Sequence, residues 1–350
     1  MEKSEYLSWK RIVIILILGI GIGLLIPKII GLKETLILLN QVKLWAFIFA
    51  LVSEGFLYIG SAILTRTVLR MTKDRLSFFD VLRISVMDSF SVQFLPLGNL
   101  GEAAVDYYFY KAKGVRTTHI ILMFVARTII IWTVFAFIYL VGVAFAPTNA
   151  ELSGGKLVII WLIYAAALGF FAYLIYLYSK RWLLIKRAGR FVGLANFFAG
   201  LFHQKKIEPE KVPLFVDKIY EATAILAANS RLQFSAVLGA LFFWFGDIFC
   251  LYFAFLGFGF KPNLAIVIFT YAIVKIIATI SFIPGGLGIT EASMSLIFIG
   301  FGIPAPTALA AVLIFRFLSF WLPIPVGLLS FLSLRKKYTN IKLEESKSSP

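Results

Sequence analysis

Long hydrophobic runs separated by short charged loops define the pattern of this sequence. A helix needs about 20 apolar residues to cross a bilayer. Runs of that kind occupy residues 12–30, 44–64, 118–145, 157–178, 232–258, 264–283 and 307–333. The first run follows Lys10-Arg11 and lacks an obvious small-residue cleavage site, so we interpret it as a retained helix and not a signal peptide. The pattern predicts an all-α polytopic integral membrane protein with a single membrane domain over residues 1–350.

Two apolar segments depart from this pattern. Residues 79–97 contain too many polar side chains for a lipid-facing span, and residues 285–302 are short and rich in glycine. Each adjoins a motif of proline, glycine and glutamate: Pro96-Leu97-Gly98-Asn99-Leu100-Gly101-Glu102 in the first half and Pro284-Gly285-Gly286-Leu287-Gly288-Ile289-Thr290-Glu291 in the second. Proline removes a helix hydrogen bond, and glycine permits left-handed backbone angles. The motifs therefore predict two broken, re-entrant helices, with turns at Pro96, Gly98 and Gly101 and at Pro284, Gly285, Gly286 and Gly288.

Charged loops predict the orientation of the chain. Lysine and arginine gather at 66–75, across 180–231 and after 334, whereas the 147–156 and 259–263 loops are poor in net positive charge. Because positive loops face the cytoplasm, both termini are expected there, and the plasma membrane is the expected location. With these assignments, successive loops can alternate between the two sides of the membrane only if both broken segments turn back at membrane depth.

The same assignment of loops to the two sides of the membrane predicts an internal repeat. The helices that carry Arg127 and Arg316 then run in opposite directions, which is typical of inverted-topology repeats in transporters. Repeat one is expected at about 44–145 and repeat two at about 232–333. Between them, 180–231 is expected to form a cytoplasmic amphipathic insert, and 335–350 a charged cytoplasmic tail.

Buried charges mark the candidate site. Glu102 precedes Arg127 by 25 residues, and Glu291 precedes Arg316 by the same interval. Ionised groups in a bilayer are costly and need partners, so the arginines are the expected partners of the glutamates. The candidate pathway residues are Glu102, Arg127, Glu291, Arg316, Lys275, Asp88 and Asp247, and Glu54 is a further intramembrane charge. The same residues are also compatible with structural ion pairs that only fix the fold.

Composition narrows the function classes. Of 350 residues, 60% are hydrophobic, and the formal net charge is +16. The mean hydropathy is +0.91. Lysine and arginine in the loops account for the positive net charge. Loops of this kind favour anionic lipid headgroups as partners and not nucleic acid. The single cysteine and the two distant histidines offer no metal-ligand spacing. Known catalytic and nucleotide-binding motifs are missing, so no metal, cofactor or catalytic residue is expected.

The second motif resembles a known family. Pro284-Gly285-Gly286-Leu287-Gly288 with Glu291, followed by Phe315-Arg316-Phe317 and a span ending in Trp321-Leu322-Pro323, is similar to the lysylphosphatidylglycerol synthase transmembrane region, also called the flippase-like domain. Leu95-Pro96, Gly98, Gly101-Glu102 and Ala126-Arg127 resemble that family's first motif, although Asn99 replaces a smaller residue. The resemblance implies a lipid flippase without the soluble aminoacyl-transferase domain, with Glu102, Arg127, Glu291 and Arg316 as site residues.

The expected function is translocation of a phospholipid or glycolipid, including an aminoacylated one, between leaflets. One alternative is a non-transporting accessory subunit of a lipid-modifying or glycosyltransferase pathway, with a lipid-modifying enzyme as its partner. A third hypothesis is an intramembrane enzyme acting on polyprenyl or glycerophospholipid substrates. The lipid, the energy source, the direction of transport and the oligomeric state do not follow from the sequence.

Overall fold

A computed structural model describes residues 32–94, 99–145, 176–201, 208–281 and 284–348, with isolated helical positions between 162 and 173. The expected first span, the Pro96 and Gly98 turn, the 147–156 loop and most of 157–178 lie outside the described residues. Within the described ranges every regular element is a helix. The prediction of an all-α polytopic membrane protein is confirmed.

Four helical stretches of the described chain are long and apolar enough to cross a bilayer. Three are single helices: α3 (Leu44–Met71), α6 (Thr117–Phe145) and α10 (Ser230–Gly257). The fourth combines α13 (Ala305–Arg316), a π-helical turn η3 (Phe317–Trp321) and α14 (Pro323–Ser348). π-Turns inside helices often occur at functional sites, and this one begins directly after Arg316.

Two pairs of shorter helices flank the Pro/Gly motifs. The first pair is α4 (Phe78–Phe94) and α5 (Asn99–Ala112). The second is α11 (Leu264–Ile280) and α12 (Ile289–Gly300), with the short 3₁₀ turn η2 (Pro284–Gly286) between them. The 17 residues of α4 or α11 cover about 26 Å at 1.5 Å per residue, less than the roughly 30 Å hydrocarbon core. The second pair is separated by η2 at the predicted motif, whereas Gly101, predicted to lie in the first turn, lies within α5 because that helix already begins at Asn99.

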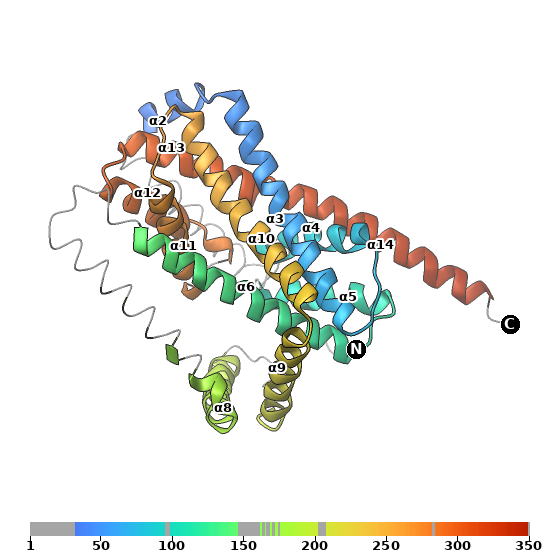
Figure 1. Ribbon diagram of the computed structural model, residues 1–350. Helices are drawn as coiled ribbons and strands as arrows, with labels where there is room; N and C mark the ends of the chain where they lie inside the picture. Colours follow the sequence, from blue (N-terminus) through green and yellow to red (C-terminus); the bar gives the residue numbers. More distant parts are fainter. Residues whose placement is uncertain are drawn as a thin grey trace.

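Helices α3 and α10 form the central pair of the molecule and lie side by side (Figure 1). Glycines allow the two backbones to touch. A Cβ on Gly60 would lie 2.5 Å from the Gly239 carbonyl oxygen, and one on Gly246 would lie 2.7 Å from the Leu57 nitrogen. Small residues at helix interfaces are a common packing device in membranes, where close van der Waals contact drives association.

Several helix contacts around this pair recur in both halves of the chain. Helix α4 packs against α14, and correspondingly α11 packs against α6. Likewise α3 contacts α4 and α6, while α10 contacts α11 and α13. Helices α5 and α6 are in contact, as are α12 and α13. Exchanging the two halves therefore leaves this set of helix contacts unchanged.

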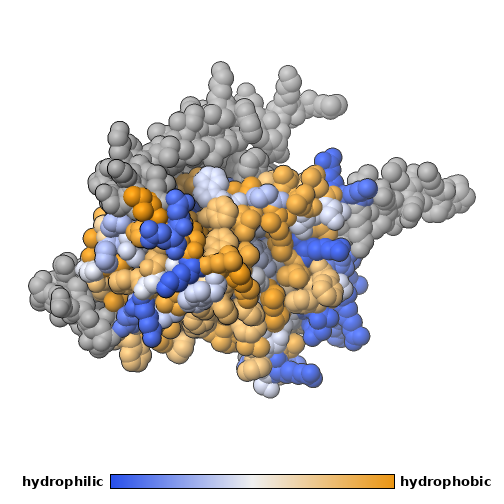
Figure 2. All heavy atoms as spheres, turned by 90° about the horizontal axis from the view of Figure 1, so that it is seen from above, coloured by the Kyte–Doolittle hydropathy of each residue, from blue (hydrophilic) through white to orange (hydrophobic). Residues whose placement is uncertain are grey.

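Three further helices lie at the ends of the bundle. Helix α2 (Leu32–Leu39) packs on α13. Helices α8 (Arg181–Leu201) and α9 (Lys211–Ala227) fall in the expected insert, pack on each other and lie together at one end of the bundle in Figure 1. One face of the molecule is mostly hydrophobic, with hydrophilic side chains gathered towards its ends (Figure 2). This surface suits a helical bundle surrounded by lipid.

Candidate functional site

The second Pro/Gly motif folds into a tight left-handed turn. Gly285, Gly286 and Gly288 have φ angles of 60°, 61° and 78°, a region that residues with a Cβ rarely occupy. Gly285 also has no room for a side chain, because its Cβ would lie 2.0 Å from the ring of Phe320. The turn sets the start of α12 and places Glu291 in the first turn of that helix.

Arg316 links this turn to Glu291. Its Nε donates to Glu291 Oε1 at 2.7 Å, and its Nη2 donates to the Gly285 carbonyl at 2.9 Å. The guanidinium also lies 4.4 Å from the ring centre of Phe320. Both charged side chains are only 9% exposed. Arg316 thus neutralises the carboxylate and supplies a charged donor to a backbone carbonyl of the turn.

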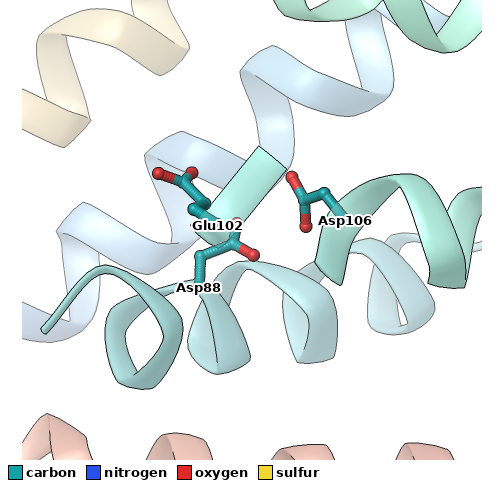
Figure 3. A group of neighbouring side chains, drawn as sticks. All are labelled: Asp88, Glu102 and Asp106. Atoms are coloured by element: carbon teal, nitrogen blue, oxygen red, sulfur yellow. The ribbon is translucent and has the colours of Figure 1, made fainter. Parts of the chain in front are cut away.

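The first half gathers a larger charged group around Arg127 of α6. Nη2 of Arg127 lies 3.2 Å from Glu102 Oε1, and Nη1 lies 3.6 Å from Asp88 Oδ2 and 3.5 Å from Asp106 Oδ2. Nη2 also donates to the Ser61 hydroxyl of α3 at 3.4 Å. Figure 3 shows the three carboxylates converging from α4 and α5. One arginine therefore faces three acidic groups, and we call these four residues the Arg127 cluster.

Asp106 is the site residue that sequence reasoning missed. Its side chain is completely buried and contacts Arg127. The available signal was its position four residues after Glu102, which places both carboxylates on one face of α5. The oxygen atoms of Asp88, Glu102 and Asp106 lie within 4.8 Å of one another, so their geometry alone would accept a cation. No metal site was expected, and Arg127 already supplies a positive charge to all three.

The remaining pathway candidates form a third group between α10 and α11. The Tyr271 hydroxyl donates to Asp247 Oδ2 at 2.5 Å, and Lys275 Nζ lies 3.8 Å from the same oxygen. Glu54 of α3 also interacts with Asp247. Asp247, an acid within an apolar helix, therefore has partners in Tyr271 and Lys275 on the neighbouring helix. Lys275 thus contacts an acid of its own half of the chain.

The two halves meet between the charged groups. Gln93 near the end of α4 donates to the Ser319 carbonyl in η3 at 3.2 Å, and Ser89 donates to the Pro323 carbonyl at 3.5 Å. Helix α4 also contacts η2. The structure thus pairs each predicted glutamate with the arginine of its own half and brings the two broken segments into one neighbourhood.

These features define a class: a helical, multi-pass membrane protein with charged groups buried beside two broken helix pairs. The model of the lysylphosphatidylglycerol synthase transmembrane region matches residues 12–327, so the chain belongs to that family. A UPF0104 membrane protein of Pyrococcus horikoshii is 32% identical over 143 residues, which is 38% of this chain and 43% of that protein. A UPF0104 membrane protein of Methanothermobacter thermautotrophicus is 32% identical over 88 residues, 25% of this chain and 26% of that protein. The matched segments span less than half the length of either relative.

Proposed function

We propose that this protein translocates an anionic membrane lipid between leaflets. The observation that carries the proposal is the burial of Arg127 and Arg316 beside the two broken helix pairs, within helical stretches long enough to cross a bilayer. Charges at membrane depth are costly and usually mark a pathway. The proposed pathway residues are Glu102, Arg127, Glu291, Arg316, Lys275, Asp88 and Asp247.

The chemistry of both sites favours a phosphate-bearing headgroup. Arginine binds phosphate and carboxylate with the same planar array of donors. Glu102 and Glu291 lie in the first turns of α5 and α12, where a helix end favours negative charge. A lipid phosphate would therefore replace each glutamate as partner of both the arginine and the helix end. The acyl chains would remain in the surrounding bilayer.

Alternating access would follow from the two-repeat arrangement. We infer that repeat one (about 44–145) and repeat two (about 232–333) are inverted relative to each other and rock about the α3–α10 contact. The packing pattern supports this arrangement because exchange of the halves preserves it. A plasma-membrane location with both termini in the cytoplasm belongs to the same proposal, since it follows from loop charge.

Reconstitution into vesicles tests the function. Fluorescent phosphatidylglycerol and phosphatidylcholine would be followed by chemical quenching of the outer leaflet. We expect wild-type protein to move phosphatidylglycerol faster than phosphatidylcholine, and Glu291→Gln and Arg316→Lys to reduce that rate at least about tenfold, equivalent to 1.4 kcal/mol in the barrier. Arg181→Lys, at an exposed ion pair with Asp217, is the matched control.

Two results would overturn the proposal. One is a wild-type protein that moves neither lipid under any tested gradient. The other is a set of folded Glu291 and Arg316 variants that transport at the wild-type rate. Either result would favour the accessory-subunit hypothesis, in which the buried pairs only stabilise the fold.

A further inference from the structure

The Arg127 cluster carries more negative than positive groups. Asp88 comes from α4, Glu102 and Asp106 come from α5, and the only cation facing them among the described residues is Arg127 of α6. The phenol of Tyr110 on α5 faces the same cluster, and α3 contributes the Ser61 hydroxyl. With every carboxylate ionised, the cluster would hold two uncompensated negative charges.

The buried carboxylates are also poorly satisfied. Asp106 is completely buried and Asp88 is 8% exposed. None of the four carboxylate oxygens of Asp88 and Asp106 accepts a hydrogen bond from the described residues. Arg127 approaches them only to 3.5 and 3.6 Å, beyond normal hydrogen-bond distance for a charged pair. Figure 3 shows the carboxylates of Asp88 and Asp106 directed toward one another, with Glu102 beside them.

Elementary electrostatics favours a further positive charge here, beyond that of Arg127. Neighbouring carboxylates in a water-poor site cannot all ionise, and such groups take up protons instead. A metal ion is a poor candidate because Arg127 lies within 3.6 Å of all three acids and would repel it. A proton shared between neighbouring carboxylates meets no such obstacle.

We propose that the Arg127 cluster is an exchangeable proton-binding site that couples proton uptake to the binding of an anionic lipid. Protonation of Asp88 or Asp106 weakens the hold of the carboxylates on Arg127, and the released guanidinium binds the lipid phosphate. Loss of the proton restores the ion pairs and expels the phosphate. This inference rests on the proposed lipid translocation and adds its energy source.

The second half of the molecule provides an internal contrast. Arg316 has a single carboxylate partner in Glu291, at 2.7 Å, and a carbonyl partner in Gly285. The charges of that pair balance, so it requires no proton. The structure therefore assigns proton binding to the Arg127 cluster and not to the Glu291–Arg316 pair.

Vesicles with an imposed pH difference test the coupling. If one proton accompanies each singly charged phosphatidylglycerol, a difference of one pH unit should shift the leaflet ratio of the lipid about tenfold at equilibrium. The pair is electrically neutral, so a membrane potential set with potassium and valinomycin should leave the ratio unchanged. Asp106→Asn should weaken the response to pH and Asp106→Glu should retain part of it, whereas Asp88→Asn combined with Asp106→Asn, which leaves only the balanced Glu102–Arg127 pair, should abolish it. Asp217→Asn, at an exposed carboxylate, should behave as wild type.

A readout independent of transport separates this inference from the proposed function. The infrared carbonyl stretch of protonated carboxyl groups, followed against pH in detergent, should include a titrating band that disappears when Asp88 and Asp106 are both replaced by Asn and persists in Asp217→Asn. Transport that ignores the pH difference, together with no such band, would overturn proton coupling and leave lipid translocation standing. The titrating band without lipid movement would instead retain proton binding and refute translocation. Transport that responds to potential but not to pH would contradict the neutral cotransport proposed here.

Discussion

Arg316 donates from Nη2 to the carbonyl oxygen of Gly285 at 2.9 Å, across 31 residues of sequence. The same guanidinium is bonded to Glu291, so one side chain joins the broken turn, the first turn of α12 and the end of α13. Unsatisfied backbone groups are costly at membrane depth. The arginine therefore stabilises the fold, besides any role in binding. For this reason, the stability and the transport rate of each variant must be measured separately.

Removal of Arg316 alone should destabilise the protein strongly. Arg316→Leu leaves Glu291 buried and unpaired, at an expected cost of about 3–5 kcal/mol in the free energy of unfolding. The double variant Glu291→Leu/Arg316→Leu removes both charges and should recover most of that loss without recovering transport. Thermal or denaturant unfolding in detergent measures these differences. Arg181→Leu, at an exposed pair, should change stability by no more than about 1 kcal/mol. Equal stability of the Arg316→Leu variant and the wild type would contradict the buried pair.

A side chain at Gly285 should disrupt the second broken segment. Gly285→Ala combines a positive φ angle with a Cβ that would lie 2.0 Å from Phe320, and we expect a loss of about 2–4 kcal/mol from backbone strain and overpacking together. Replacing Phe320 by Leu in the same protein should remove part of the steric cost and leave the backbone cost. A double-mutant cycle measures this coupling. Purely additive effects would show that the ring does not close over the turn.

Glycine substitutions on α3 should have opposite effects according to their position. Gly60→Ala should separate α3 from α10, because its Cβ would lie 2.5 Å from the Gly239 carbonyl oxygen and the Phe243 nitrogen. Gly55 lies in the same helix with open space around it, so Gly55→Ala should be neutral or stabilising by up to about 1 kcal/mol. Folded yield and melting temperature in detergent test the contrast. Similar behaviour of the two variants would argue against the close crossing.

Loss of the Tyr271 hydroxyl should weaken the third charged group. Tyr271→Phe removes the hydroxyl that donates to Asp247 Oδ2 at 2.5 Å. The variant keeps Lys275, whose Nζ lies 3.8 Å from the same oxygen, as a charged partner of Asp247. A hydrogen bond to a charged group contributes about 1.5–3 kcal/mol, which is the expected loss of stability. Asp247→Asn combined with Tyr271→Phe should cost less than the two single changes added together. The comparison requires unfolding curves for all four proteins of the cycle.

Local sequence determined the helical class and the positions of the broken segments. Long apolar runs leave helices as the available spanning structure, because every backbone group must be bonded within the segment. Proline with several glycines predicted both breaks, and the second turn, at Gly285, Gly286 and Gly288, has the left-handed angles that glycine permits. The equal spacing of Glu102–Arg127 and Glu291–Arg316 correctly indicated the ion-pair partners.

Tertiary structure decided how the remaining charges are grouped. Asp106 joined the Arg127 cluster because α5 folds back against α4 and α6, a placement that no single segment encodes. Asp247 found Tyr271 and Lys275 only once α10 and α11 packed together. Hydrophobic periodicity tells which residues are helical but not which helices touch in a membrane, where close packing of small residues such as Gly60 and Gly246 sets the partners. The imbalance of three acids around one arginine therefore became visible only in the folded chain.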